Sequence, residues 1–167
     1  MSPPNTTWTP ENGTQTSEGV KWDTSAETTT ARSYYNGART YYNWYTATAG
    51  TTDISTTSNN ASGSICPQEW TLPTSSNFVN ITTIYDIANS SVGSTKLRSV
   101  PLSFGYTGFY NFSKGSLEGA SSYSFYYSRT VDPDLGIYYL RSLNNSVDPQ
   151  SSVYRNNGLA IRCLAKP

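Results

Sequence analysis

The sequence predicts a single α+β domain in which short antiparallel strands outnumber helices. One segment, at residues 73–88, repeats its apolar side chains at spacings of three and four, which is typical of an amphipathic helix. From residue 100 onward, short runs of β-favouring residues alternate with turns rich in Gly, Ser, Asn, Asp and Pro. A length of 167 residues suits one domain with a hydrophobic core.

Composition divides the chain into two regions. Residues 1–30 consist mostly of Thr, Ser, Asn, Glu and Pro around Trp8 and Trp22, so we interpret them as an N-terminal extension, either a stalk or a wrap on the domain surface. We interpret residues 31–167 as the ligand-binding domain. The N-terminus lacks the basic and apolar regions of a signal peptide. No apolar run approaches the ~18 residues of a membrane span, so we expect no membrane insertion by this chain.

The first elements are predicted around Asn36-Gly37, which lies among aromatic, β-favouring residues. This pair predicts a type I′ turn between short strands. The alternation from Thr40 to Thr48 predicts one central strand, and residues 50–64 form a polar loop.

One helix is expected, beginning at Pro73-Thr74 with Thr74 or Ser75 as its N-cap. Its apolar stripe consists of Phe78, Ile81, Ile84 or Tyr85, and Ala88. The remaining elements are predicted to be irregular antiparallel strands within residues 101–112, 122–130, 136–147 and 157–165.

Charge and composition exclude several function classes. Eleven basic and eleven acidic residues cancel, which argues against nucleic acid or an anionic membrane as the partner. Charged residues make up 13% of the chain, against about 25% in an ordinary soluble domain, and Ser, Thr and Asn replace them, as is typical of extracellular proteins. Because histidine is absent, Ser-His-Asp and Cys-His catalytic arrangements are excluded. No glycine-rich phosphate-binding loop is present.

The acidic residues do not predict a catalytic pair, and we expect no enzyme activity, cofactor or metal. Candidate carboxylates are few, namely Glu69, Asp86, Glu118, Asp132, Asp134 and Asp148. Asp132 and Asp134 flank a proline and supply only a fragment of a calcium site, so we interpret them as a solvated turn.

The two cysteines, Cys66 and Cys163, lie outside any CxxC pair. In a chain rich in Ser and Thr they most simply form one disulfide, which would place the protein in an oxidising compartment. Two buried free thiols are the alternative.

Residues 121–157 have the composition of a recognition surface. They contain six tyrosines, eight serines and four asparagines, the residues that dominate antibody combining loops. We expect Tyr123, Phe125, Tyr127 and Tyr154 to be exposed. Tyr126, Tyr138 and Tyr139 are expected to pack inward. The predicted ligand-binding residues are Tyr123, Phe125, Tyr127, Arg129, Asp132, Asp134, Arg141, Leu143, Asp148, Gln150, Ser152, Tyr154, Asn156 and Asn157.

Five motifs occur in an order that resembles the bacterial major paralogous domain family named for Fibrobacter succinogenes. They are YYNWYTA (41–47), ICPQEWTLPTSSNF (65–78), FYYSRT (125–130), YYL (138–140) and GLAIRCLAK (158–166). The resemblance implies a C-type lectin-like fold, a Cys66–Cys163 disulfide, and a last strand from Gly158 to Leu164 in the central β region. Similar domains serve as the variable proteins of diversity-generating retroelements, whose C-terminal surface is retargeted by mutagenesis.

The chain departs from the family pattern at several positions. Gln68-Glu69 replaces the usual Lys/Gln-Gly, and Thr71 replaces Arg. Tyr127 stands where many members have Trp, and Arg129 where they have Ser. The calcium motifs of sugar-binding C-type lectins and the active-site cysteines of formylglycine-generating enzymes are missing from the sequence.

Together these observations predict a secreted or surface-displayed, adhesin-like or receptor-like domain without catalytic activity. Its expected partner is a protein or glycan ligand on another cell or virus surface. The alternative is a structural cell-surface or stalk module whose tyrosines serve packing or self-assembly. Oligomeric state and ligand identity are left open by the sequence.

Overall fold

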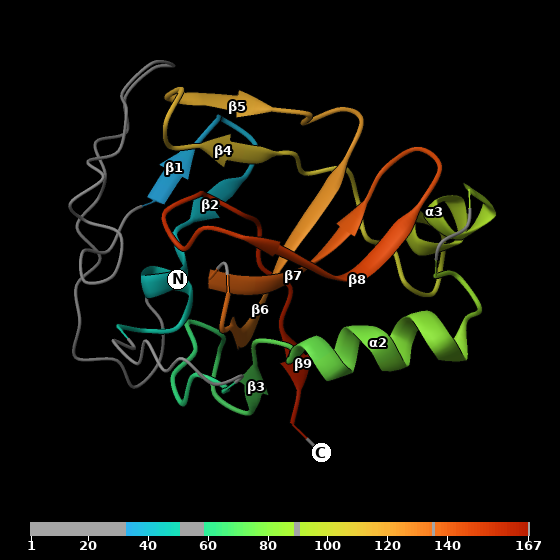
Figure 1. Ribbon diagram of the computed structural model, residues 1–167, viewed down its shortest axis with the longest axis horizontal. Coiled ribbons are helices and arrows are strands. Elements are labelled where there is room, and N and C mark those ends of the chain that lie inside the picture. Colours follow the sequence, from blue (N-terminus) through green and yellow to red (C-terminus); the bar gives the residue numbers. More distant parts are fainter. Residues whose placement is uncertain (1–32, 51–58, 89–90, 135, 167) are drawn as a thin grey trace.

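The computed structural model describes residues 33–50, 59–88, 91–134 and 136–166, and it confirms a mixed α+β architecture with mostly small antiparallel sheets (Figure 1). The predicted N-terminal extension, residues 1–30, lies outside the described residues. In chain order the elements are β1 (Ser33–Tyr35), β2 (Thr40–Tyr42), α1 (Trp44–Ala47), β3 (Trp70–Thr71), α2 (Ser75–Ile84), α3 (Ser91–Arg98), β4 (Phe109–Asn111), β5 (Ser116–Glu118), β6 (Ser124–Asp132), β7 (Gly136–Ser142), β8 (Val147–Val153) and β9 (Leu164–Ala165).

The central sheet has three antiparallel strands in the order β6-β7-β8, and the pairs β1-β2, β3-β9 and β4-β5 form smaller sheets. Successive side chains of β6 point to opposite faces of this sheet. Phe125 and Tyr127 join the core cluster around Trp44, while Tyr126 joins a second cluster with Phe78 of α2. Helix α2 lies under the sheet in Figure 1, and both faces of β6 are therefore covered.

The Asn36-Gly37 hairpin is confirmed, but its turn is longer than predicted. Strands β1 and β2 pair with Tyr35 opposite Thr40, so four residues form the loop instead of the two of a type I′ turn. The Asn36 side chain organises this loop, because its Oδ1 accepts hydrogen bonds from the backbone N–H groups of Ala38 and Arg39 at 3.0 and 2.8 Å.

The predicted strand from Thr40 to Thr48 is wrong beyond Tyr42. There the chain turns into α1, for which Asn43 is the N-cap and accepts a hydrogen bond from the Thr46 N–H at 3.1 Å. The local capping interaction, and the burial of Trp44 in the core, outweigh the alternating pattern.

Helix α2 begins where the sequence predicts, with Thr74 as N-cap, but its apolar stripe is only half correct. Phe78 is fully buried, whereas Ile84 is 77% exposed and Tyr85 and Ala88 are also exposed. The helix ends at Ile84, and a left-handed residue at Asp86 (φ 48°) then turns fully buried Ile87 into the core. Helices α1 and α3 were not predicted.

The C-terminal segment runs through the middle of the domain, but it does not form the continuous strand that the resemblance implies. Gly158, Leu159 and Ala160 make isolated bridges to β4, β2 and β6 respectively, and only Leu164–Ala165 forms a strand, β9. The disulfide joins Cys66 to Cys163 with their Cα atoms 5.8 Å apart, which confirms the pairing.

Candidate functional site

Burial sorts the predicted ligand-binding residues into three groups. Four are exposed, namely Tyr123, Asp134, Gln150 and Tyr154. Five are half-buried, namely Arg129, Arg141, Leu143, Asp148 and Ser152. Five are buried, namely Phe125, Tyr127, Asp132, Asn156 and Asn157. The expected exposure of Phe125 and Tyr127 is therefore wrong, while Tyr123 and Tyr154 are exposed as predicted.

Tyr127 is a core residue. Its side chain has no exposed surface, and its hydroxyl donates a hydrogen bond to the Asn157 carbonyl at 2.7 Å. Burial raises the pKa of Tyr127 well above its ordinary value. A covered strand can bury a tyrosine in this way only because the hydroxyl has a partner.

The inward tyrosines follow the same rule. Tyr126 is buried as predicted, and its hydroxyl donates to the Gly105 carbonyl at 3.0 Å. Tyr139 is also buried, whereas Tyr138 is half-buried. Arg129 is tied to the 59–61 segment, since its Nη1 donates to the Ala61 carbonyl at 3.4 Å. These contacts account for Arg129 as a structural residue.

Phe125 forms the floor of an aromatic cluster on the face of the sheet that is opposite α2. Its ring centroid lies 5.2 Å from that of Phe109, 6.1 Å from that of Tyr123 and 5.7 Å from that of Tyr139. Two of these contacts are edge-on, the geometry that aromatic pairs prefer. Three strands, β4, β6 and β7, and the residue that precedes β6 thus bring four rings together.

Tyr123 is the exposed member of this cluster and is held firmly. Its backbone N–H bonds the Gly119 carbonyl at 2.9 Å, and its ring lies directly on Gly119. A Cβ at Gly119 would fall 2.4 Å from the Tyr123 ring, and the residue has φ +66°, so glycine is required there on both counts. Tyr123 is 36% exposed, with one side of its ring against Gly119.

A half-exposed ion pair borders the rings. Arg141 lies opposite Phe125 on β6 and opposite Asp148 on β8, and its Nη2 donates to Asp148 Oδ2 at 3.2 Å. Burial raises the pKa of Tyr139, and the hydrogen bond with Ser151 and the charge of Arg141 oppose that rise. Leu143 also borders the rings, and it packs against the core cluster around Trp44. We call this surface the aromatic patch: Phe109, Tyr123, Phe125, Tyr139, Arg141, Leu143 and Asp148.

Tyr154 does not reach the aromatic patch, whereas Gln150 adjoins it, because its backbone N–H donates to Asp148 Oδ1 at 3.0 Å. Tyr154 follows the end of β8, next to the residues that pair with the start of β7, whereas Tyr123 adjoins the opposite end of the sheet. The seven residues of β8 span about 20 Å at ~3.3 Å per residue. The structure therefore divides the predicted site into two separate surfaces.

Three of the candidate carboxylates, Asp132, Glu118 and Asp148, have structural partners. Asp132 Oδ1 accepts a hydrogen bond from the Asp134 N–H at 3.2 Å, which is the turn that the sequence predicts. Glu118 pairs with Lys114 at 2.6 Å, and Asp148 pairs with Arg141. Within the described residues, no three His, Cys, Asp or Glu side chains are grouped so that they could hold a metal ion.

Sequence reasoning missed Phe109, whereas it correctly assigned Tyr139 to the interior. The three aromatic residues within residues 109–112 are the signal that would have suggested an aromatic surface near Phe109. Tyr139 could not have been found in this way, because its place beneath the patch depends on the pairing of β6 with β7.

Among the residues described, no helix is both long enough and apolar enough to cross a membrane. The family resemblance rests on the five sequence motifs. Two of these motifs contain Cys66 and Cys163, which are joined as the resemblance implies. No protein-family model matches this chain, and no curated protein and no solved structure matches it either.

Proposed function

We propose that this protein is a non-catalytic ligand-binding domain that contacts its partner through the aromatic patch. The carrying observation is that the exposed ring of Tyr123 packs on buried Phe125, which in turn contacts buried Tyr139, beside the half-exposed Arg141–Asp148 pair. Tyrosine offers a large, rigid contact area, and arginine offers several hydrogen-bond donors, which is why both are enriched at binding hot spots.

The proposed partner is a protein or glycan on another cell or virus surface. Aromatic rings stack on sugar rings and on peptide planes, and the Arg141 guanidinium can share its donors between Asp148 and a ligand acceptor. The patch carries one positive and one negative side chain, which suits a largely neutral ligand better than a polyanion such as nucleic acid.

The finer fold assignment is part of the same proposal. A C-type lectin-like fold is supported by the cysteine pair, by the main helix α2, and by a C-terminal segment that makes bridges with β2, β4 and β6. The disulfide is compatible with a secreted or surface-displayed protein.

Self-assembly through the tyrosines has less support. Of the six tyrosines in residues 121–157, three are buried in this domain, namely Tyr126, Tyr127 and Tyr139. The exposed edge of the central sheet, β8, contains Pro149, which removes a backbone donor and discourages pairing with another edge.

The proposal is tested with arrays of defined glycans and of purified extracellular domains, probed with the full chain. Arg141→Ser and Tyr123→Ser are each expected to reduce the signal of a binding spot at least tenfold. Tyr154→Ser is the matched control, because it makes the same change in an exposed tyrosine at the other end of the sheet.

Equal loss in the Tyr123→Ser and Tyr154→Ser proteins would contradict the placement of the site. Concentration-dependent sedimentation of the wild-type chain alone, abolished by Tyr123→Ser, would favour the structural alternative instead.

Diversification by a retroelement would also predict which codons of this chain vary. If a template repeat diversifies this chain, its variable codons should include Tyr123, Arg141 and Asp148, whose side chains reach the surface. The codons of buried Tyr127 and Leu140 should stay constant, because changes there would disrupt the core. A nearby reverse-transcriptase gene and the variable positions of its repeat would decide this point, and variation confined to core codons would contradict it.

A further inference from the structure

A pocket lies on the other side of β6, away from the aromatic patch. It has a volume of about 300 Å³ and is lined by Arg39, Thr40, Thr107, Tyr126, Ala160 and Ile161. Phe125 belongs to the patch and Tyr126 to this pocket, and neighbouring residues of a strand point to opposite faces. The volume is at the lower end of the range of about 300–1,000 Å³ for small-molecule sites.

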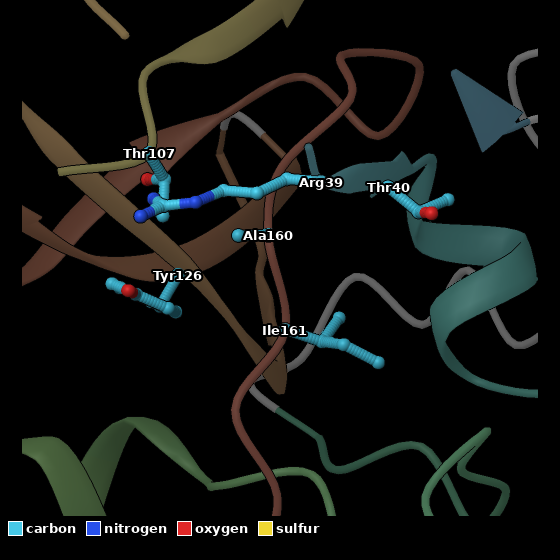
Figure 2. Close-up of a pocket in the computed structure, with 6 residues that line it drawn as sticks. All are labelled: Arg39, Thr40, Thr107, Tyr126, Ala160 and Ile161. Carbon is cyan, nitrogen blue, oxygen red and sulfur yellow. The ribbon is translucent and has the colours of Figure 1, made fainter. Parts of the chain in front are cut away.

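Arg39 extends across this pocket and is anchored at both ends. Its backbone belongs to the loop between β1 and β2, and its Nη1 donates a hydrogen bond to the Tyr106 carbonyl. Figure 2 shows the side chain passing over Ala160, with the guanidinium beside Thr107 and with Tyr126 on the same side. An arginine has five N–H donors, so this contact leaves most of them for a ligand.

Two more arginines contact the loop of residues 103–107, which contains Tyr106. The guanidinium of Arg162 lies 4.3 Å from the ring centroid of Phe104, and its Nη1 donates to the Ser103 carbonyl at 2.8 Å. The guanidinium of Arg98 lies 4.4 Å from the ring centroid of Tyr106. Within the described residues, none of the three pairs with a carboxylate, and their guanidinium groups contact rings and carbonyl oxygens instead.

The other lining groups suit a small polar molecule. The Tyr126 hydroxyl donates to Gly105 and keeps an acceptor lone pair, and its pKa is raised by burial against the opposing charges of Arg39 and Arg162. Ala160 and Ile161 supply an apolar wall. Among the described residues that line the pocket, none is acidic.

We propose that this pocket binds a small acidic sugar, whose carboxylate is held by the guanidinium of Arg39. Arginine recognises carboxylates with paired, charge-assisted hydrogen bonds, and the Tyr126 hydroxyl, on the same side as the guanidinium, can bond a sugar hydroxyl. The nearby charge of Arg162 adds attraction for the anion. This site is independent of the aromatic patch and does not rest on its proposed role.

The test is a titration of the full ¹⁵N-labelled chain with D-glucuronate, followed by backbone and arginine side-chain NMR signals. We expect saturable shifts at Gly105, Thr107 and the Arg39 Nε–H. D-glucose is the neutral match in shape and is expected to cause no such shifts. Acetate tests whether a carboxylate alone is sufficient, and we expect it to bind at least tenfold more weakly than glucuronate.

Variants separate the pocket from general electrostatics. Arg39→Gln should weaken glucuronate binding at least tenfold, whereas Lys96→Gln, which removes one exposed positive charge on α3, should leave it unchanged. Arg39→Lys keeps the charge but not the planar fork, so it should weaken binding several-fold even if Arg39→Gln disturbs the hairpin.

Three results would overturn the proposal: equal binding of glucose and glucuronate, equal binding of acetate and glucuronate, or unchanged affinity in both Arg39 variants.

Discussion

The Tyr127 hydroxyl is the clearest case of a polar atom that serves stability and not recognition. It has one partner, the Asn157 carbonyl, in a site without solvent access. Tyr123, four positions earlier, keeps its ring at the surface and has no buried hydroxyl to satisfy. The same residue type therefore takes opposite roles on one strand segment.

We expect Tyr127→Phe to lower the free energy of unfolding by about 1–2 kcal/mol, because it leaves a buried carbonyl without its donor. Tyr123→Phe should change it by less than about 0.5 kcal/mol, as is usual for surface positions. Urea denaturation of both proteins measures the difference. Equal effects of the two substitutions would mean that the burial of Tyr127 is wrong.

Glu69 occupies a backbone conformation that suits glycine. It has φ 63° in a turn closed by a hydrogen bond from the Trp70 N–H to the Pro67 carbonyl at 2.9 Å. A positive φ at this position of a turn normally selects Gly or Asn. The resembled family has glycine here, and the geometry supplies the physical reason.

We therefore expect Glu69→Gly to stabilise the domain by about 0.5–1 kcal/mol, since relief of left-handed strain exceeds the entropy that glycine adds to the unfolded chain. Gln68→Gly is the control. It lies one position earlier without a positive φ, and should destabilise the protein or leave it unchanged. Thermal unfolding of the two variants measures both effects, and a destabilised Glu69→Gly protein would refute the strained turn.

At the scale of elements, local capping decides where α2 begins. Thr74 Oγ1 accepts from the Asn77 N–H at 3.1 Å, and Asn77 Oδ1 accepts from the Thr74 N–H at 2.8 Å. This reciprocal pair satisfies two backbone donors that the first turn of a helix cannot.

Thr74→Ala should cost about 1 kcal/mol of stability, the usual value for losing a capping side chain. Ser76→Ala, at an exposed position in the same first turn, should be neutral within about 0.5 kcal/mol. Chemical denaturation compares them, and a neutral Thr74→Ala would show that the cap does not hold the helix.

Elements with strong local signals could be predicted, and those that depend on distant contacts could not. The hairpin around Asn36 and the start of α2 follow from side chains that bond their own neighbours. The strand predicted through Trp44 failed because burial of that ring and the Asn43 cap favour a helical turn. The end of α2 failed because its outward face has nothing to pack against.

At the scale of the whole molecule, buried tyrosines dominate the response to pH. Burial raises the pKa of Tyr41, Tyr110, Tyr126, Tyr127 and Tyr139 in the folded state. In the unfolded chain each returns to about 10. Above that pH the unfolded state binds fewer protons than the folded state, so stability falls as pH rises.

We expect stability to vary little between about pH 6 and 9, since no histidine titrates there, and to fall steeply above pH 10. A fully buried tyrosine contributes about 1.4 kcal/mol per pH unit to that fall. Equilibrium denaturation at several pH values measures the slope. Tyr127→Phe should reduce it, and an unchanged slope in that variant would exclude Tyr127 as a contributor.

The candidate site was predictable in part. Tyr123, Phe125, Arg141, Leu143 and Asp148 were identified from composition alone and lie together in the aromatic patch. Tyr154 shares their composition, but strand pairing places it at the far end of the sheet. Composition describes what a segment contains, and it carries no information about which ends of the strands meet.

The α+β class, the start of the main helix and the early hairpin follow from local sequence, because these features depend on hydrogen bonds and periodicity among near neighbours. The sequence also supplied the cysteines whose pairing the structure shows. Tertiary contacts set which core cluster each ring of β6 joins and how Arg39, Thr107, Tyr126 and Ala160 form one pocket. Burial is set by distant segments that cover each face of a strand, and no local pattern records them.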